Sequence, residues 1–314
     1  MNKRHYNLAI IGGGPAGMTA AIYGARSGLS TFLLESMTLG GAMATAPVIE
    51  NYPGYENVTG FELSQIMKKQ VQKSGAEIKE MAKVVEAYLK NNPKKILTDS
   101  EEYTCDALII ATGGERKKLG AKGEAEYYGR GVSYCAVCDG PLYKNKKVAV
   151  VGGGNCAASA ALYLNNIARE VTLIHRRDDL RCEGILKNKI SQCKINVVWN
   201  SVVKEVKGEK TLKTIIIENL QNHETSELNI DGLFIEIGII PNSSIFVEAG
   251  VDVDEAGYII VDKDMKTNIE GVFAAGDVTG GVEQIAVAVG KGTTAYNSAY
   301  EYINSITQKN SCKL

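Results

Sequence analysis

Short, unbroken runs of apolar residues, each followed by a glycine-rich turn, mark the start of the chain. The first run covers residues 8–11 and leads into Gly-Gly-Gly-Pro-Ala-Gly at 12–17, after which an alanine-rich stretch extends to about residue 27. A second apolar run, 31–34, ends at Glu35. Apolar runs of this length, bounded by turn residues, are typical of strands buried on both faces of a parallel sheet. The pattern therefore predicts strand, turn, helix and strand in succession, as at the start of a doubly wound α/β domain.

The same pattern returns later in the chain. Residues 8–36 align with residues 148–176 without a gap, and 8 of the 29 positions are identical. The repeat has apolar runs at 148–151 and 171–174 and a second glycine turn at 152–157. Internal similarity of this kind indicates a duplicated structural unit. We expect an α/β protein with two Rossmann-like nucleotide-binding domains, each of three layers (ββα/βαβ).

Weaker patterns lie between and after the two modules. Residues 61–74 carry Phe61, Leu63, Ile66, Met67 and Val71, which predicts an amphipathic helix with these side chains on one face. Apolar runs predict hairpin strands at 84–89 and 95–98, a buried strand at 107–113, and strands at 196–206, 212–218, 231–238, 259–261 and 271–275. Residues 284–300 suit a helix, and 307–314 suit a polar, frayed tail in which Cys312 is incidental.

Turn signals suggest where the chain passes between the two domains. They occur at 117–123 and near Pro241-Asn242. We place a discontinuous domain at residues 1–116 and 246–314, with the second domain inserted at 117–245. A chain of 314 residues is long enough for two domains of ordinary size.

The first glycine turn has the residues that a dinucleotide site requires. Gly12 allows the tight turn, Gly14 lets the backbone approach a pyrophosphate, and Gly17 lets the helix pack on the strand. The start of the helix offers unbonded N–H groups and a positive dipole end. Glu35 can accept hydrogen bonds from ribose hydroxyls. We therefore expect this module to bind a dinucleotide with an unmodified ribose.

The second turn differs in charge. His175 falls on the position of Glu35 in the aligned repeat, and Arg176, Arg177 and Arg181 follow it. Basic residues at this place would pair with a ribose 2′-phosphate, whereas an acid would repel it. This module should therefore prefer NADPH to NADH. The alternative is a solvated charge run that happens to follow a strand.

Two cysteines stand between the modules, at 135 and 138, with Asp139 directly after them. A Cys-x-x-Cys pair can form a small disulfide ring or a dithiol with readily lowered thiol pKa values. The neighbouring carboxylate could move the proton that such a cycle adds and removes. The alternatives are a buried structural pair or half of a metal site, but no second Cys-x-x-Cys exists to complete a four-thiolate set.

Composition narrows the classes of function. The chain is 45% hydrophobic and 23% charged with a net charge of −1, which fits a soluble globular protein and gives no electrostatic basis for binding nucleic acid or an anionic membrane. No apolar run reaches the roughly 20 residues of a membrane span, and no signal peptide is recognised. The other cysteines are scattered at 105, 156, 182, 193 and 312, which favours a reducing cytoplasm.

Together these residues resemble the low-molecular-weight thioredoxin reductases, the class II FAD-dependent pyridine nucleotide-disulfide oxidoreductases, nearly from end to end. The resemblance is carried by 12–17, 111–113 (Ala-Thr-Gly), 135–140 (Cys-Ala-Val-Cys-Asp-Gly), 152–157, 175–177 with Arg181, and 276–277 (Gly-Asp). It implies that FAD is held by the discontinuous domain through Gly12, Gly14, Pro15, Ala16, Gly17, Glu35, Gly41, Asn51, Thr112, Gly113, Asp277 and Gln284. It implies that NADPH is held by the inserted domain through Gly152, Gly154, Asn155, Ala157, His175, Arg176, Arg177 and Arg181.

The resemblance also implies an activity. Hydride passes from NADPH to the flavin, and the reduced flavin opens the Cys135–Cys138 disulfide, with Cys138 the sulfur nearer the flavin and Asp139 the acid/base. Cys135 then attacks the disulfide of thioredoxin, and Cys138 resolves the mixed disulfide. Members of the family are homodimers and rotate one domain against the other.

Four places depart from the common family pattern. Ala42 follows the Gly40-Gly41 pair where glutamine is common, Asn155-Cys156 replace Asp-Ser, Ser159 replaces glutamate, and Glu283 stands where arginine is common. Some relatives take electrons from reduced ferredoxin, and these usually lack the basic residues found here. The alternatives to an NADPH-dependent reductase are therefore a ferredoxin-dependent flavin thioredoxin reductase, a paralogue acting on another disulfide or on a small dithiol metabolite, and a flavin-binding redox sensor or scaffold.

Overall fold

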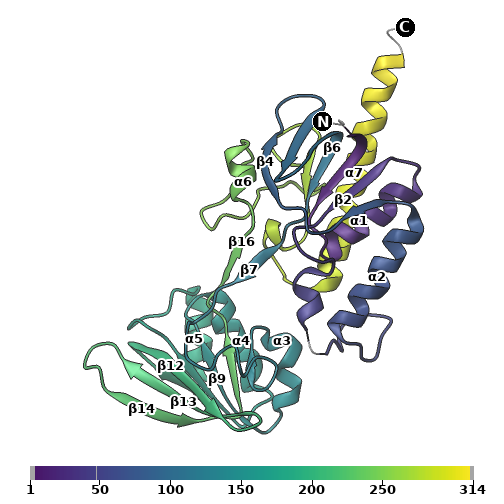
Figure 1. Ribbon diagram of the computed structural model, residues 1–314. Helices are drawn as coiled ribbons and strands as arrows, with labels where there is room; N and C mark the ends of the chain where they lie inside the picture. Colours follow the sequence, from purple (N-terminus) through teal and green to yellow (C-terminus); the bar gives the residue numbers. More distant parts are fainter. Residues whose placement is uncertain (1–3, 47, 312–314) are drawn as a thin grey trace. The chain divides into compact units, whose positions relative to one another are not determined.

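The computed structural model describes residues 4–46 and 48–311, and these form two compact units (Figure 1). The first unit contains the chain up to Glu115 and again from Ile240, and the second unit is Arg116–Ile239. The two crossing segments, β7 (Gly114–Arg116) and β16 (Ile239–Pro241), pair with each other. The return crossing adjoins the turn predicted at Pro241-Asn242, and the first unit resumes six residues before the predicted boundary at residue 246. The reason is that α6 (Ser244–Glu248) buries Phe246 in a core of the first unit.

A seven-stranded sheet forms the centre of the first unit, in the order β3-β2-β1-β6-β5-β4, with β17 beside β6. Strand β6 pairs with β1 along one edge, whereas its other edge is shared by β5 and β17. The strands are β1 (Arg4–Ile11), β2 (Thr31–Leu34), β3 (Glu77–Lys79), β4 (Val84–Tyr88), β5 (Lys94–Thr98), β6 (Glu102–Ile110) and β17 (Val272–Ala274). The antiparallel pairing of β4 with β5 confirms the predicted hairpin.

Both faces of this sheet are covered. Leu8 and Ile10 point into a core shared with the helices α1 (Pro15–Arg26), α2 (Gly60–Ser74) and α7 (Ile285–Ser311). Ala9 and Ile11 point into a second core on the opposite face. Side chains alternate between the faces of a strand, so a strand buried on both sides shows no polar alternation. This explains the continuous apolar run from which the strand was predicted.

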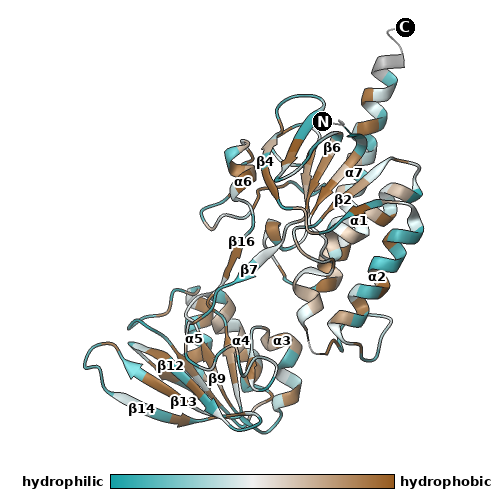
Figure 2. Cartoon of the chain, viewed as in Figure 1, coloured by the Kyte–Doolittle hydropathy of each residue, from teal (hydrophilic) through white to brown (hydrophobic). Residues whose placement is uncertain are grey.

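Helix α2 confirms one sequence expectation and corrects another. It begins at a capping box made by Thr59 and Glu62 and ends at Gly75 in the left-handed conformation. Leu63, Met67 and Val71, spaced by four residues, are buried as expected. Phe61 is 64% exposed and Ile66 36% exposed, so their assignment to the buried face was wrong. In Figure 2 the outer side of α2 is mostly hydrophilic.

The second unit has three layers. A parallel sheet in the order β11-β10-β9-β15-β8 is covered on one face by α4 and α5 and on the other by the antiparallel sheet β12-β13-β14. The parallel strands are β8 (Val132–Ser133), β9 (Lys147–Val151), β10 (Glu170–Ile174), β11 (Ile195–Val198) and β15 (Gly232–Ile235). The helices are α4 (Asn155–Asn165) and α5 (Gly184–Gln192), and the covering strands are β12 (Ser201–Gly208), β13 (Leu212–Asn219) and β14 (Thr225–Asn229).

Three further expectations need correction. The single strand predicted at 196–206 is two strands, β11 and β12, which lie in different sheets because Asn200 adopts a positive φ of 51° between them. Residues 259–261 make only an isolated bridge, between Ile259 and Val253. Helix α7 continues to Ser311 through most of the expected tail, and Cys312 lies outside the described residues.

Short elements complete the chain. They are α3 (Ala136–Asp139) and the 3₁₀ turns η1 (Gly41–Thr45), η2 (Gly140–Tyr143) and η3 (Asp277–Thr279). None of the helices among the described residues has both the length and the apolar composition that a membrane span requires.

Candidate functional site

Cys135 and Cys138 form a disulfide in the second unit, at the carboxyl end of β8. Cys135 is half-buried and Cys138 exposed, so one sulfur faces the outside of this unit. The backbone N–H of Cys138 donates to Cys135 Sγ at 3.2 Å. A donor at this sulfur stabilises the negative charge that develops on it when the disulfide opens. The structure therefore favours Cys135 as the sulfur released during reduction.

Asp139 lies half-buried one residue after the pair. Burial raises the pKa of its carboxyl, while the hydroxyl of Ser133 and the charge of Arg116 act in the opposite direction. The Ser133 Oγ donates to Asp139 Oδ2 at 2.6 Å, and the Cys135 N–H donates to the same Oγ at 3.0 Å. A raised proton affinity suits a carboxyl that gives up a proton in one step and takes one back in another.

Two carboxylates bond residues that flank the disulfide, one through the backbone of Ala136 and one through the side chain of Tyr134. Glu236, at the end of β15, accepts from the Ala136 N–H at 3.2 Å. Glu124 is only 4% exposed and accepts from Tyr134 Oη at 2.7 Å and from the N–H groups of Leu119 and Gly120. Sequence reasoning missed Ser133, Glu124 and Glu236, because no motif distinguishes them from any serine or glutamate near a strand.

The first glycine turn is closely packed inside and open outside. Gly12 has a φ of 109°, and a side chain there would overlap the carbonyl of Ala111. At Gly14, by contrast, no atom of the described chain lies within 4 Å of the place a Cβ would take. Gly41 backs onto Gly14 from the other side, with 3.1 Å between its would-be Cβ and the Gly14 Cα. The turn thus presents bare backbone at the start of α1, as a bound pyrophosphate requires.

Glu35 lies beside this turn. Its Oε2 accepts from the Gly13 N–H at 2.7 Å and its Oε1 from the Met37 N–H at 2.8 Å. Oε1 also accepts from Ser36 Oγ at 3.0 Å, so Oε2 is the oxygen that keeps a lone pair for a ribose hydroxyl. The position fits the role predicted for it.

Hydrogen bonds join predicted site residues from distant parts of the chain within the first unit. Asn51 donates to Gln284 at 3.1 Å, which joins two predicted FAD residues across 233 positions. Thr112, next to Gly113, donates through Oγ1 to the carbonyl of Asn242 at 2.7 Å, and the Asn242 side chain donates back to the Thr112 carbonyl. Sequence reasoning did not assign Asn242 to the site.

The Gly-Asp turn near the C-terminus belongs to the same cluster. Gly276 has a φ of 80°, and its would-be Cβ lies 3.0 Å from the Ala16 Cβ. Asp277 follows at the start of η3, so this turn lies beside the first turn of α1, which Pro15 and Gly17 also form. Each predicted FAD residue thus lies in the first unit, and the open backbone at Gly14 fits such a group.

The second glycine turn repeats this geometry. Gly152 has a φ of 151°, and Gly154 has no described atom within 4 Å of a would-be Cβ. Ala157 is fully buried under the turn. Asn155 and Glu183 exchange two hydrogen bonds at the start of α4, one from the Asn155 side chain at 3.0 Å and one from the Glu183 N–H at 2.9 Å.

The basic residues divide into two groups. His175 is 7% exposed, its ring packs directly against Gly153, and it meets Trp199 edge-on. Burial lowers the pKa of His175, so the ring is neutral near pH 7 and supplies packing rather than charge. Arg176 and Arg181 are exposed and Arg177 half-buried, and the Arg181 N–H donates to the Gly153 carbonyl at 2.6 Å. The positive charge beside the turn comes from the three arginines.

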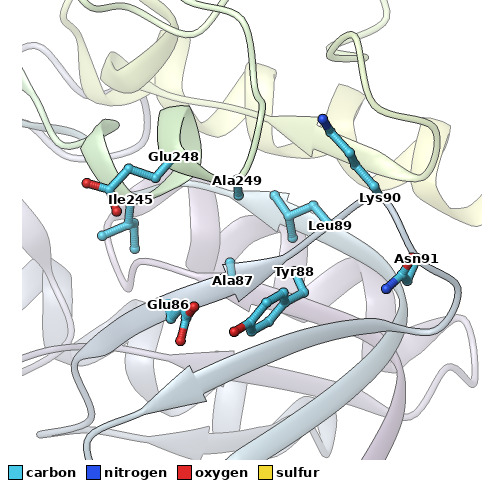
Figure 3. Close-up of a pocket in the computed structure, with 9 residues that line it drawn as sticks. All are labelled: Glu86, Ala87, Tyr88, Leu89, Lys90, Asn91, Ile245, Glu248 and Ala249. Carbon is cyan, nitrogen blue, oxygen red and sulfur yellow. The ribbon is translucent and has the colours of Figure 1, made fainter.

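A shallow pocket elsewhere on the first unit holds none of these groups. It is lined by β4, the following residues through Asn91, and α6 (Figure 3). Its lining includes the polar side chains of Glu86, Tyr88 and Glu248 together with apolar ones such as Leu89 and Ile245. It shares no residue with either glycine turn.

Comparison with known proteins supports this description. The pyridine nucleotide-disulphide oxidoreductase family matches residues 6–292. A thioredoxin reductase from Coxiella burnetii is 43% identical over 321 aligned positions, which cover 98% of this chain and 100% of that protein. The crystal structure of thioredoxin reductase from Streptococcus pyogenes has a TM-score of 0.90 at 40% identity, covering 97% of this chain and 100% of that one. The predicted α/β class with two Rossmann-like domains is thereby confirmed.

A solved structure with a different electron donor in its name is also similar. The ferredoxin-flavin thioredoxin reductase from Clostridium acetobutylicum is 32% identical and covers 98% of this chain and 100% of that one, with a TM-score of 0.52. The chain thus matches a family named for pyridine nucleotides and also resembles a protein named for ferredoxin.

Proposed function

This chain belongs to the pyridine nucleotide-disulphide oxidoreductases of the thioredoxin reductase type, and from that premise we propose that it passes electrons from NADPH through FAD and the Cys135–Cys138 disulfide to thioredoxin. The observation that carries the proposal is the disulfide itself, which stands with Asp139 in the unit that also contains the second glycine turn. A donor site, a cofactor site and a dithiol on one chain form an electron relay.

FAD fits the first unit. Its pyrophosphate would lie on the bare backbone at Gly14 and its ribose hydroxyls on Glu35, and Asn51, Thr112, Asp277 and Gln284 would contact the rest of the group. A flavin held there would supply two-electron transfer between a nicotinamide and a disulfide. The missing glutamine at Ala42 removes one contact without closing the site.

NADPH fits the second unit better than NADH does. Arg176, Arg177 and Arg181 stand beside an open turn, and guanidinium groups bind phosphate through paired, charge-assisted hydrogen bonds. Reduced ferredoxin is the second candidate, supported by the acidic Glu183 at the start of α4 and by the likeness to the clostridial protein. The arginines favour NADPH, since a protein donor has no 2′-phosphate for them to bind.

The thiol steps follow from the chain's own geometry. Two electrons entering at Cys138 break the S–S bond and leave the negative charge on Cys135, where the Cys138 N–H stabilises it. Asp139 supplies the proton and takes one back in the next half-cycle. Cys135 then attacks the disulfide of thioredoxin, and Cys138 attacks the resulting mixed disulfide, which releases reduced thioredoxin.

We also propose a homodimer in the cytoplasm. The support is the family resemblance and the state of Cys105, Cys182 and Cys193, which form no disulfide. Light scattering on the purified protein tests the dimer.

Anaerobic titration of the purified flavoprotein tests the donor. NADPH should bleach the flavin absorbance at stoichiometric amounts, and reduced ferredoxin should not be needed for thioredoxin reduction. No bleaching at millimolar NADPH would reject NADPH, and activity only with reduced ferredoxin would establish the second candidate. Unchanged thioredoxin reduction by Cys138→Ser would reject the relay and favour a sensor or scaffold.

A further inference from the structure

Ser133 connects the acid/base residue with the redox disulfide. It is the last residue of β8, where it pairs with Phe234 of β15, and it is 2% exposed. Its Oγ is 2.6 Å from Asp139 Oδ2, 3.0 Å from the Cys135 N and 3.3 Å from the Cys135 carbonyl oxygen. One buried hydroxyl thus contacts three groups on the segment that carries the chemistry.

This arrangement serves both protonation states of Asp139. A hydroxyl has one hydrogen to donate and two lone pairs with which to accept. When Asp139 is ionised, Ser133 donates to Oδ2 and accepts from the Cys135 N–H. When Asp139 is protonated, the carboxyl donates to Ser133, whose hydrogen turns to the Cys135 carbonyl. No group is left unsatisfied in either state, which matters because an unpaired buried polar group is costly.

Other charged and titratable groups face Asp139 as well. Arg116 of β7 favours the ionised carboxyl, and Tyr143 of η2, whose pKa is raised to about 12 by burial and then by Asp139 and Asp231, stays neutral. Glu236 bonds the Ala136 N–H in the same loop. Ser133 is the neighbour whose hydrogen can change partner, whereas the charge of Arg116 is fixed.

We propose that Ser133 is a positioning residue for the proton transfer at the disulfide, holding Asp139 in place and exchanging its own hydrogen-bond partner as Asp139 titrates. This rests on the acid/base role proposed for Asp139. In the reducing step the S–S bond takes two electrons from the reduced cofactor and breaks. The cleavage gives two thiolates; Asp139 O–H gives its proton to one of them and becomes a carboxylate, the other stays a thiolate, and the Ser133 hydrogen turns from the Cys135 carbonyl to Oδ2. The reverse turn accompanies proton uptake in the next half-cycle.

The test compares Ser133→Ala with Ser133→Thr in the complete flavoprotein. Ser133→Ala should lower kcat for thioredoxin reduction about tenfold with little change in KM, because a hydrogen bond to a charged group is lost. The limb of the pH profile governed by Asp139 should move to higher pH, since the ionised form loses a donor. Ser133→Thr keeps the hydroxyl and should therefore have the wild-type kcat and the wild-type pH profile. Alkylation of the reduced dithiol by iodoacetamide, followed against pH, reports the same shift without turnover.

Ser298→Ala is the matched control. Ser298 is 6% exposed, lies in α7 of the first unit, and donates to the Asp264 carbonyl at 2.6 Å, so it loses a comparable buried hydroxyl. It should leave the pH profile unchanged. If Ser133→Ala gives the same kcat and pH profile as Ser298→Ala, the proposal is wrong. Should Ser133→Ala fail to fold, Ser133→Val against Ser133→Thr makes the same comparison with nearly equal volume.

Asp139→Asn distinguishes failure of the acid/base role of Asp139 from failure of the positioning role of Ser133. If Asp139→Asn keeps full activity, the acid/base assignment fails and Ser133 loses its role with it. If Asp139→Asn is inactive while Ser133→Ala is normal, the acid/base assignment stands and the inference about Ser133 is overturned.

Discussion

The two glycine turns of this chain have the same backbone and opposite surroundings. Gly12 and Gly152 both have positive φ, and Gly14 and Gly154 both present open backbone at a helix start. The residues that follow the second strand of each module, Glu35 and His175, occupy the same place in the repeat. In both cases the side chain packs against the middle glycine of the turn. A Cβ added at Gly13 would lie 3.1 Å from Glu35 Oε2, and a Cβ added at Gly153 would lie 2.1 Å from the His175 ring.

This comparison distinguishes support of the glycine turn from binding of a phosphate, two roles that the sequence alignment assigns to the same position. The aligned position supports the turn in both units, by a hydrogen bond from Gly13 to Glu35 and by the buried ring of His175 beneath Gly153. Under the proposed function, the preference for a phosphate falls to the three arginines that follow the strand. A histidine after the strand is therefore weaker evidence for NADPH than the arginines that follow it.

The largest effect should come from replacing Gly17, the last glycine of the first turn, by the alanine that the second turn has at the matching position. Gly17→Ala would overlap the carbonyl oxygen of Gly12, whereas the matching residue of the second turn is already alanine, Ala157. We expect Gly17→Ala to destabilise the protein by about 3 kcal/mol through overpacking and to weaken flavin retention. Thermal unfolding and the flavin content after gel filtration measure both.

Ala157→Gly is the reciprocal change and its control. It should cost about 1 kcal/mol, the usual preference of a helix for alanine over glycine, and leave flavin content unchanged. Equal destabilisation by the two changes would contradict a closer approach of the helix to the turn at Gly17 than at Ala157.

The sequence predicted the backbone of this site better than its polar contacts. Glycine spacing and the internal repeat identify both turns, because close backbone packing requires particular residues at fixed intervals. Ser133 and Asn242 carry no such requirement, and their roles exist only once strands far apart in sequence have paired. The burial of His175 was missed for a related reason, since Trp199 comes from a different strand end. Sequence periodicity also misplaced Phe61, because one helical turn of apolar residues does not reveal where the buried stripe ends.

Charge is the next difference to test. Arg181→Ala should raise KM for NADPH about tenfold to a hundredfold and hardly affect NADH, because a charge-assisted phosphate contact is lost. Steady-state kinetics with both nucleotides measures the ratio. Arg169→Ala removes an exposed arginine of the same unit outside the motif and serves as control. An equal effect on NADH and NADPH would contradict a role in binding the 2′-phosphate.

A smaller effect concerns the pH dependence of stability. Burial lowers the pKa of His175 from its ordinary value of 6.5, so below that pH the unfolded chain takes up a proton that the folded chain does not. Stability present above pH 6.5 is therefore lost as the pH falls toward the folded-state value. His175→Gln lacks this titrating group, so its stability should fall less with pH than that of the wild type. Between pH 7.5 and 5.5 its Tm should drop by up to about 4 °C less than the wild-type Tm. His223→Gln, at a histidine whose side chain is 76% exposed, should keep the wild-type dependence.

The smallest expected effect distinguishes the two electron donors. Glu183 places a carboxylate at the start of α4 through its bonds to Asn155, where it opposes the approach of a nucleotide phosphate. Glu183→Gln keeps the size of the side chain and removes the charge, so KM for NADPH should fall about twofold, as an exposed charge contact of a few tenths of a kcal/mol allows. Glu170→Gln neutralises another exposed acid of the unit, one that pairs with Lys147, and should leave KM unchanged. A rise in KM for NADPH would show instead that the Asn155–Glu183 pair prepares the turn for the nucleotide. Unchanged NADPH kinetics together with weaker reduction by ferredoxin would place Glu183 on the surface that a protein donor uses.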